Sequence, residues 1–203
     1  MKDFIAYLAA ILAIVSVIPY LIDIIKKRTK PNIVSWSTWT LLTMIATIAT
    51  FSAGEYRAAL LLLGSTTSTL LVVLLGLKYG IAKLALFDVF CWLAALGGII
   101  LWQAFDSPTI AIIITVATDC LGVLPTIRHA WSSPKEETWQ TFVVGAVAAL
   151  LTFLSLETFN INNVLYPGYL VFANSIIAIT VVIRRRQKGI PLSRRSIHET
   201  LHN

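Results

Sequence analysis

The sequence predicts an all-α membrane protein of seven transmembrane helices, arranged as two parallel three-helix repeats joined by a linker helix. Three observations lead to this fold class. The chain of 203 residues is 57% hydrophobic and only 13% charged, so it is far more apolar than a soluble globular domain. Its apolar residues fall into seven long runs. A proline-containing phrase near its start also returns in its second half.

Each of the seven runs is long enough to be a membrane span, which needs about 20 helical residues to cross about 30 Å of hydrocarbon. Because the bilayer core offers no partner to backbone groups, runs of this length are expected to be helices rather than strands. The first run looks like a secretory signal peptide, but it continues without a cleavage site, so we expect a retained helix. The runs cover residues 4–25, 34–53, 57–77, 84–104, 109–130, 138–156 and 163–183.

The basic residues predict the orientation of the seven spans. Only Lys2 and Arg57 fall on the side of the N-terminus, so the positive-inside rule places the N-terminus outside and the C-terminus in the cytoplasm. We expect an integral protein of the cell membrane, plasma or inner. The net charge of +6 then faces anionic lipid, and no nucleic-acid partner is expected. The basic residues on the cytoplasmic side are Lys26, Lys27, Arg28, Lys30, Lys78, Lys83, Arg128, Lys135, Arg184, Arg185, Arg186, Lys188, Arg194 and Arg195.

An internal repeat aligns the two halves of the chain. The segment "SVIPYLI" is similar to "GVLPTIR" in its pattern of residue types around the proline. Removing three residues from the first basic loop then aligns a later proline and tryptophan as well. A further shift of a few residues aligns the third helix of each half. The aligned pairs are Pro19 with Pro125, Pro31 with Pro134, Trp36 with Trp139 and Ser65 with Asn174.

This alignment predicts the domain organisation. Residues 1–80 form the first three-helix repeat, 81–106 the linker helix, 107–186 the second repeat and 187–203 a basic cytoplasmic tail. Both repeats enter the membrane from the same side, so they are parallel and related by an axis along the membrane normal. Such repeats enclose a central cavity, which is where transporters bind their solutes.

Two matched residue pairs suggest a gate near the cytoplasmic side. Pro19 and Pro125 each remove a backbone hydrogen bond about two turns from the inner end of a helix, which favours a hinge; simple helix bending is the alternative. Trp36 and Trp139 begin the second and sixth helices. They are expected either to lie in the aromatic belt of the membrane interface or to form a lid on the inner gate.

The layout resembles the PQ-loop and SWEET superfamily of small-solute transporters. The resemblance rests on the 3+1+3 helices, the orientation, and a proline-containing helix followed by a basic loop in each half, and it extends to about residue 186. The chain has "PY" at Pro19 and "PT" at Pro125 where that family often has Pro-Gln. The resemblance implies alternating-access transport of a sugar, amino acid or vitamin precursor; PnuC vitamin-precursor transporters share the layout and remain an alternative.

Asn174 is the first candidate for solute contact. It stands among apolar residues near the middle of the seventh run, and a buried amide must point into the bundle. The resembled family often has an asparagine at the cavity-facing midpoint of the third helix of a repeat, which implies a substrate-binding role for Asn174 and its counterpart Ser65. The alternative is a hydrogen bond that only holds helices together.

Asp119 is the candidate for proton or cation coupling. It lies near the middle of the fifth run, where a carboxylate needs a cation, hydrogen-bond donors or a proton. Its aligned position in the first half is Ala13, so such a site would be asymmetric. The alternative is a structural aspartate bound to nearby hydroxyls. Asp23 and Asp88, closer to helix ends, are expected to be solvated caps or interface charges.

Enzyme activity is not expected. The three histidines lack a metal-ligand spacing, and no nucleophile or phosphate-binding motif is present, so the sequence predicts no catalytic residue, cofactor or metal. The expected partners are a small-molecule solute and the lipid bilayer, and assembly into a homo-oligomer stays open. A receptor or sensor on the same scaffold is the alternative function, since a fold does not determine what a protein does.

Overall fold

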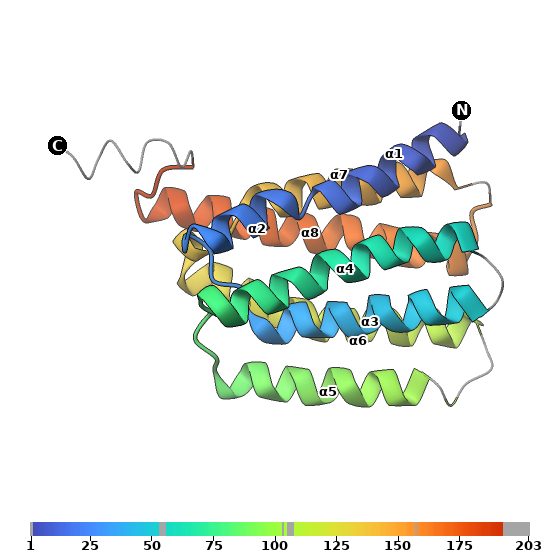
Figure 1. The fold of residues 1–203 in the computed structure, drawn as a ribbon, viewed down its shortest axis with the longest axis horizontal. Helices are drawn as coiled ribbons and strands as arrows, with labels where there is room; N and C mark the ends of the chain where they lie inside the picture. The colour runs from blue at the N-terminus through green and yellow to red at the C-terminus, as the bar shows by residue number, and fades with distance from the viewer. Residues whose placement is uncertain (1, 53–55, 103, 105–107, 157, 193–203) are drawn as a thin grey trace.

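The computed structural model describes residues 2–52, 56–102, 104, 108–156 and 158–192. Over these residues the regular structure is helical throughout, which confirms the all-α prediction. The helices lie side by side along one long axis and form an elongated bundle (Figure 1). The elements are α1 (Lys2–Val15), α2 (Ile18–Ile25), α3 (Ile33–Ser52), α4 (Tyr56–Tyr79), α5 (Leu86–Trp102), α6 (Pro108–Ser132), the 3-10 turn η1 (Pro134–Glu136), α7 (Trp139–Ser155) and α8 (Ile161–Gln187).

The helices coincide with the predicted apolar runs. Only Ser16 and Val17 separate α1 from α2, so these two helices form one segment, and each of the seven runs overlaps one helical segment of the described chain. Among the described residues, three segments are long and apolar enough to cross a membrane. They are Lys2–Ile25, Ile112–Ser132 and Asn163–Gln187.

The break between α1 and α2 lies one residue before Pro19, which is the second residue of α2. Proline has no amide hydrogen and its ring clashes with the preceding turn, so it fits best in the first turn of a helix, which is where α2 places it. The Ser16 hydroxyl at the break donates to the Ala13 carbonyl at 2.7 Å. Pro125, the aligned residue of the second half, lies inside α6, which is continuous from Pro108 to Ser132. The two prolines therefore have different effects on their helices.

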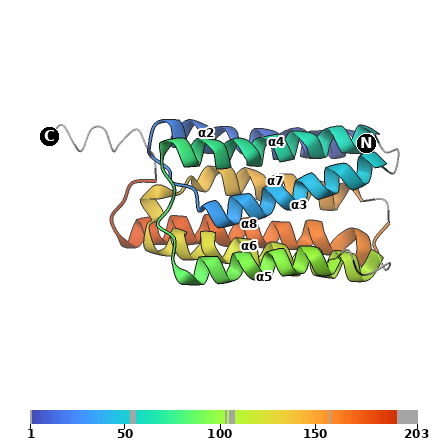
Figure 2. The same cartoon turned by 60° about the horizontal axis from the view of Figure 1, so that its bottom comes forward.

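The helices form two groups, and two pairs of helices make the contacts between these groups. α4 packs against α3 and against α1 and α2, while α8 packs against α7 and α6. The groups meet where α1 packs against α7 and where α3 packs against α6. α5 lies at the edge of the bundle beside α6 and α3 (Figures 1 and 2).

Basic residues gather at one end of the bundle, which lies on the left in Figure 1 and is called the basic end below. It contains the loop 26–32, the turn η1 and the last turn of α8. Arg184, Arg185 and Arg186 lie in that last turn, where cations complement the negative end of the helix dipole. Lys2 lies at the opposite end.

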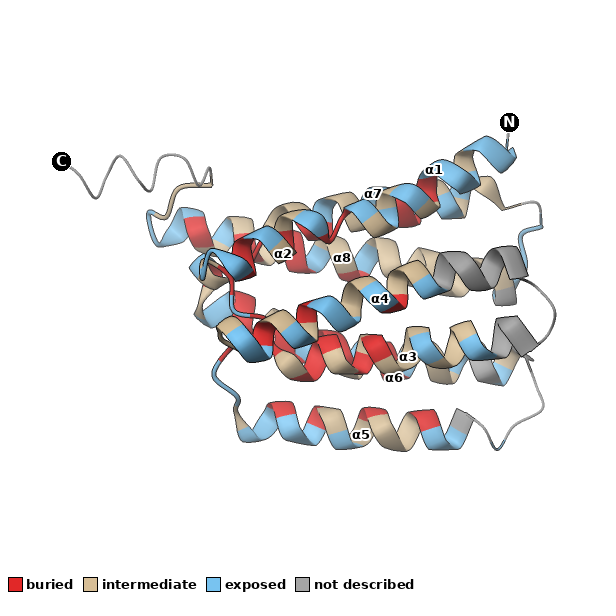
Figure 3. Ribbon diagram, in the orientation of Figure 1, coloured by how far each residue is buried: buried red, intermediate tan, exposed pale blue. Residues whose placement is uncertain are grey.

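Many large apolar residues are exposed on the outside of the bundle. Figure 3 shows the exposed positions of the helices in pale blue. Phe4 is 71% exposed, Leu86 86% and Phe172 71%. The buried apolar cluster lies inside, and Tyr20 and Ile24 of α2 are fully buried in it. An outer surface of this kind exceeds the scattered apolar patches of soluble monomers.

The expectation that Asp23 and Asp88 are solvated is wrong. Asp88 is 0% exposed and accepts hydrogen bonds of 2.8 Å from Arg128 Nε and from the Ala85 amide, and Arg128 Nη2 also contacts its second oxygen. Asp23 is 8% exposed and accepts a bond of 3.0 Å from Thr138 Oγ1. Both carboxylates are buried because partners far along the chain supply the donors that water would otherwise provide.

Candidate functional site

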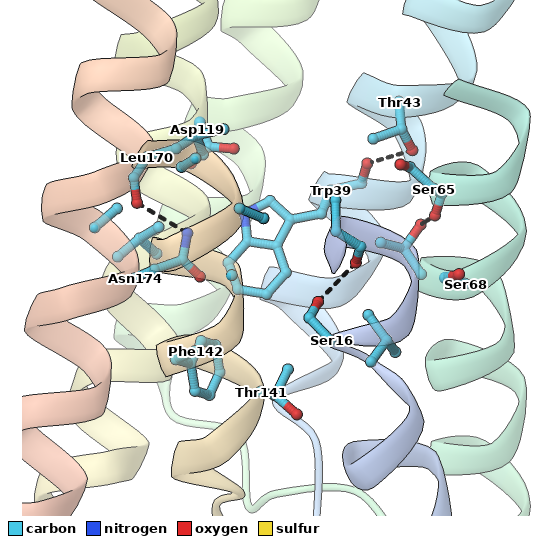
Figure 4. A pocket seen from close by; sticks show the side chains of 18 of the residues that line it. Ser16, Trp39, Thr43, Ser65, Ser68, Asp119, Thr141, Phe142, Leu170 and Asn174 are labelled. Atoms are coloured by element: carbon cyan, nitrogen blue, oxygen red, sulfur yellow. Dashed lines mark hydrogen bonds between the residues drawn. The ribbon is translucent and has the colours of Figure 1, made fainter. Parts of the chain in front are cut away.

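A cavity of about 250 Å³ lies in the middle of the bundle. Residues of α1, α3, α4, α6, α7 and α8 line it, so both parts of the chain contribute to its wall (Figure 4). The wall combines polar side chains with aromatic rings and small residues. Its mixture of apolar and convergent polar groups is typical of a small-molecule site, and its volume lies just below the usual range of about 300–1,000 Å³.

The structure brings four of the predicted site residues together. They come from α3, α4, α6 and α8, and all of them border the cavity. The predicted residues in the wall are Asn174, Ser65, Asp119 and Trp36. The predicted residues outside the wall, toward the basic end, are Pro19, Pro125 and Trp139.

Asn174 reaches the cavity through its carbonyl oxygen. Its Nδ2 donates to the Leu170 carbonyl of the same helix at 2.9 Å (Figure 4). The Oδ1 then faces α7, where a Cβ built on Gly145 would lie 2.8 Å from it. The missing side chain at Gly145 therefore makes the space that the amide oxygen occupies.

Asp119 is buried at 3% exposure and is held by hydrogen-bond donors from other helices. The Tyr169 hydroxyl of α8 donates to its Oδ2 at 2.7 Å. Tyr166 and Trp39 direct further donor groups to the same carboxylate. Within the described chain, no Lys, Arg or His forms an ion pair with Asp119. The carboxylate is thus surrounded by neutral donors.

Three aromatic rings separate the cavity from the basic end. Tyr20 lies 4.7 Å from Trp36 and 6.2 Å from Phe142 between ring centroids, the second contact being edge to face. Trp36 Nε1 donates to the Tyr20 hydroxyl at 3.3 Å. Because Trp36 is only 3% exposed, it does not lie in an exposed interfacial belt. Trp139 is half-buried, and its Nε1 donates to the Leu192 carbonyl at 3.4 Å.

Beyond these rings, buried polar contacts join α2 and the loop after it to the residues just before α7. The Tyr20 hydroxyl donates to Glu137 Oε2 at 3.0 Å. Thr138 Oγ1 donates to Asp23 Oδ2 at 3.0 Å and lies 2.7 Å from the hydroxyl of Thr29. All five side chains are at most 8% exposed. These contacts close the basic end of the bundle between the two parts of the chain.

Two further interactions hold the same loops. The Lys30 ammonium pairs with Glu136 Oε1 at 2.6 Å, and the Lys30 amide donates to the Glu136 carbonyl at 3.0 Å. Arg185, only 1% exposed, donates to the carbonyls of Pro134 at 2.9 Å and Glu137 at 2.8 Å. A guanidinium in this place satisfies loop carbonyls that would otherwise be buried without donors.

Sequence reasoning missed several residues of the site. Tyr166 precedes Tyr169 by three residues and Asn174 by eight, so the helical period places it near both on α8 and could have identified it. Tyr20 and Glu137 gave no such signal, because their partners lie more than a hundred residues away. Arg185 was counted only as one positive charge among many.

No group of three or more His, Cys, Asp or Glu side chains in the described ranges is arranged to hold a metal ion. The residues around the cavity instead offer hydrogen bonds, aromatic surface and one carboxylate. This arrangement is suited to binding a small solute.

Comparisons of the chain with protein-family models, with curated proteins and with solved structures find no match. The resemblance to PQ-loop and SWEET proteins therefore rests on the sequence features alone.

Proposed function

We propose that the protein is an integral membrane transporter that moves a small polar solute by alternating access. The apolar outer surface supports a position in the bilayer, since hydrocarbon is the solvent that matches exposed side chains such as Phe4 and Phe172. The basic end would face the cytoplasm and the N-terminus the outside.

The lining of the cavity is the observation that carries this proposal. When the sequence alignment of the two halves is extended through the helices, both members of six aligned pairs line the cavity. A cavity built from aligned positions is the arrangement that transporters with internal repeats use for solute. The pairs are Ala13 with Asp119, Val17 with Val123, Trp39 with Phe142, Leu42 with Gly145, Ser65 with Asn174 and Ser68 with Ile177.

The helix contacts support the 3+1+3 layout in the same way. The alignment pairs the α1–α2 segment with α6, α3 with α7, and α4 with α8. The contact between α1 and α7 therefore corresponds to the contact between α6 and α3, and both contacts are present. Likewise, the α3–α4 contact corresponds to α7–α8, and the α2–α4 contact to α6–α8. α5 would be the linker at the edge.

The buried contacts at the basic end support alternating access. They join the two repeats below the cavity, so they would close the cytoplasmic gate in this conformation and separate when the repeats rock apart. The break at Ser16 and Val17, one residue before Pro19, would supply a hinge. Asp119 would couple a proton or a cation to the movement, since it is the carboxylate in the cavity wall.

The proposal is tested by ligand binding followed by flux. Thermal unfolding of the purified protein is measured against a library of metabolites, because a ligand that binds the folded state raises its stability. Hits are then tested for uptake into liposomes that contain the protein. We expect a small polar metabolite to stabilise the wild type, to stabilise Asn174→Ala less, and to cross the membrane.

Binding without uptake would replace the transporter by a receptor or sensor. Stabilisation by a peptide or lipid alone would do the same. Empty liposomes and liposomes with heat-denatured protein are the controls for leakage.

A further inference from the structure

Five of the hydroxyl groups around the cavity offer acceptors rather than donors, whereas the hydroxyl of Thr141, which also lines it, has no hydrogen-bond partner in the described chain and keeps its hydrogen. Each of the five hydroxyl side chains donates its hydrogen to a backbone carbonyl three or four residues earlier in the chain, at 2.7 to 3.2 Å. A hydroxyl has one hydrogen and two lone pairs, so only its acceptor sites remain for a solute. The five residues are Ser16, Thr43, Ser68, Thr69 and Thr152.

The two strongest polar groups of the wall are acceptors as well. Asn174 uses one of its two amide hydrogens on Leu170 and presents Oδ1. Asp119 is a carboxylate, which accepts at up to about four lone-pair positions when ionised, and Tyr169, Tyr166 and Trp39 direct donors to it. The neutral donors around Asp119 leave its charge without a counterion in the described part of the chain.

The cavity wall contains one carboxylate and, over the described residues, no lysine, arginine or histidine. Aromatic rings lie beside the acceptors, and the side chain of Trp39 extends toward Asp119 and Asn174 (Figure 4). The faces of such rings attract cations. An anionic solute would instead meet the Asp119 carboxylate without a compensating positive charge.

From this placement we infer that the solute is an organic cation, such as a protonated amine, whose charged group binds Asp119 and Asn174 Oδ1 beside the Trp39 ring. The inference rests on the proposed transport function and specifies the class of its solute. An ammonium group has three donors and no acceptor, which matches the Asp119 carboxylate, Asn174 Oδ1 and the five hydroxyl acceptors. A neutral polyol would leave the Asp119 carboxylate without a counterion and is matched less well.

Binding and uptake are measured separately with two sets of matched probes. One set is tyramine, tyrosol and hydroxyphenylacetate, and the other is butylamine, butanol and butyrate. Each set keeps the carbon skeleton and changes the end group from a cation to a neutral hydroxyl to an anion. Binding is followed by thermal unfolding in detergent, and uptake by liposomes that contain the protein.

We expect the amines to bind and to be taken up in preference to their neutral and anionic counterparts. Asp119→Asn should weaken amine binding about tenfold or more, because hydrogen bonds to charged groups are worth about 1.5–3 kcal/mol. Asp3→Asn removes the same charge from an exposed position outside the cavity and should bind amines like the wild type.

The outcomes separate the inference from the proposed function. Neutral or anionic probes that bind as tightly as the amines, or amine binding that survives Asp119→Asn, overturn the cationic solute; if those probes are taken up, transport still stands. Amines that bind but do not cross the membrane support the cation site and overturn transport. If none of the six probes binds, the inference is wrong.

Discussion

The phenol of Tyr20 donates a hydrogen bond of 3.0 Å to Glu137, 117 residues further along the chain. Both residues are 0% exposed. The bond joins α2 to the loop before α7, on the side of the basic end from the aromatic rings that border the cavity. In the proposed alternating-access cycle, opening of the basic end would require this bond to break, so its strength would contribute to the balance between the closed and open conformations.

Tyr20→Phe should lower the free energy of unfolding by about 1–3 kcal/mol, because it removes one donor from a buried carboxylate. The measurement is chemical unfolding in detergent micelles. Glu137→Gln combined with Tyr20→Phe should destabilise by less than the sum of the single effects, since the two residues share one interaction. Tyr7→Phe changes a 56% exposed phenol and serves as the matched control. Additive effects would contradict the coupling.

Gly145→Ala should impair the cavity through Asn174. The new Cβ would lie 2.8 Å from Asn174 Oδ1, closer than packed atoms allow, so the amide must turn away from its position. We expect solute affinity to fall about tenfold, as for the loss of a hydrogen bond of about 1.5 kcal/mol. Affinity is measured by isothermal titration calorimetry with the solute found by unfolding.

Gly97→Ala is the control for the glycine substitution. A Cβ at Gly97 meets no atom within 4 Å, so the change keeps solute affinity and stabilises α5 by up to about 1 kcal/mol through helix propensity. Equal losses of affinity in Gly97→Ala and Gly145→Ala would show that the contact with Asn174 is irrelevant.

The helices and part of the site could be predicted because their signals are local. The length of an apolar run can be read directly from the sequence and shows whether the run could span a membrane. Asn174 and Asp119 each interrupt such a run, and a polar side chain at that depth must point into the bundle. Asp23 was placed wrongly, because its partner Thr138 lies 115 residues away and no local pattern indicates it. Tyr20 could not be identified from the sequence for the same reason, because its partner Glu137 lies 117 residues away.

The difference between the two prolines shows another limit of the alignment. Pro19 and Pro125 occupy aligned positions, yet only the first coincides with a helix break. Packing against neighbouring helices determines whether the hydrogen bond lost at a proline breaks the helix or leaves it continuous. The sequence around the proline does not show which of the two occurs.

Uptake should decline at acidic pH in the wild type, and Asp119→Asn should remove this dependence. A proton on Asp119 neutralises the charge that would bind a cationic solute, so uptake is strongest where the carboxylate is ionised. Initial uptake rates into liposomes at equal inside and outside pH measure the effect. A variant that lacks the Asp119 charge and keeps the wild-type pH profile would show that another group titrates; Asp3→Asn is the control.

Arg185→Lys should destabilise the protein by about 2 kcal/mol, although the charge is kept. Lysine lacks the planar fork that donates to the carbonyls of Pro134 and Glu137 together. Arg186→Lys, one residue further at an exposed position, should change the unfolding temperature little. Thermal unfolding of both variants in the same detergent compares them, and equal shifts would exclude a special role for the buried guanidinium.

Pro19→Ala should slow transport without weakening solute binding. Alanine restores the amide hydrogen that Pro19 lacks, so residues 2–25 can form one continuous helix, favoured by up to about 3 kcal/mol over proline in a helix interior. If the break at Ser16 and Val17 is the hinge of the inner gate, the stiffened helix hinders opening while the cavity keeps its wall.

Pro125→Ala is the matched control, because α6 is already continuous there and should gain less rigidity. Uptake rate and affinity are measured for both variants. Equal rates for Pro19→Ala and the wild type would mean that the break only bends the helix.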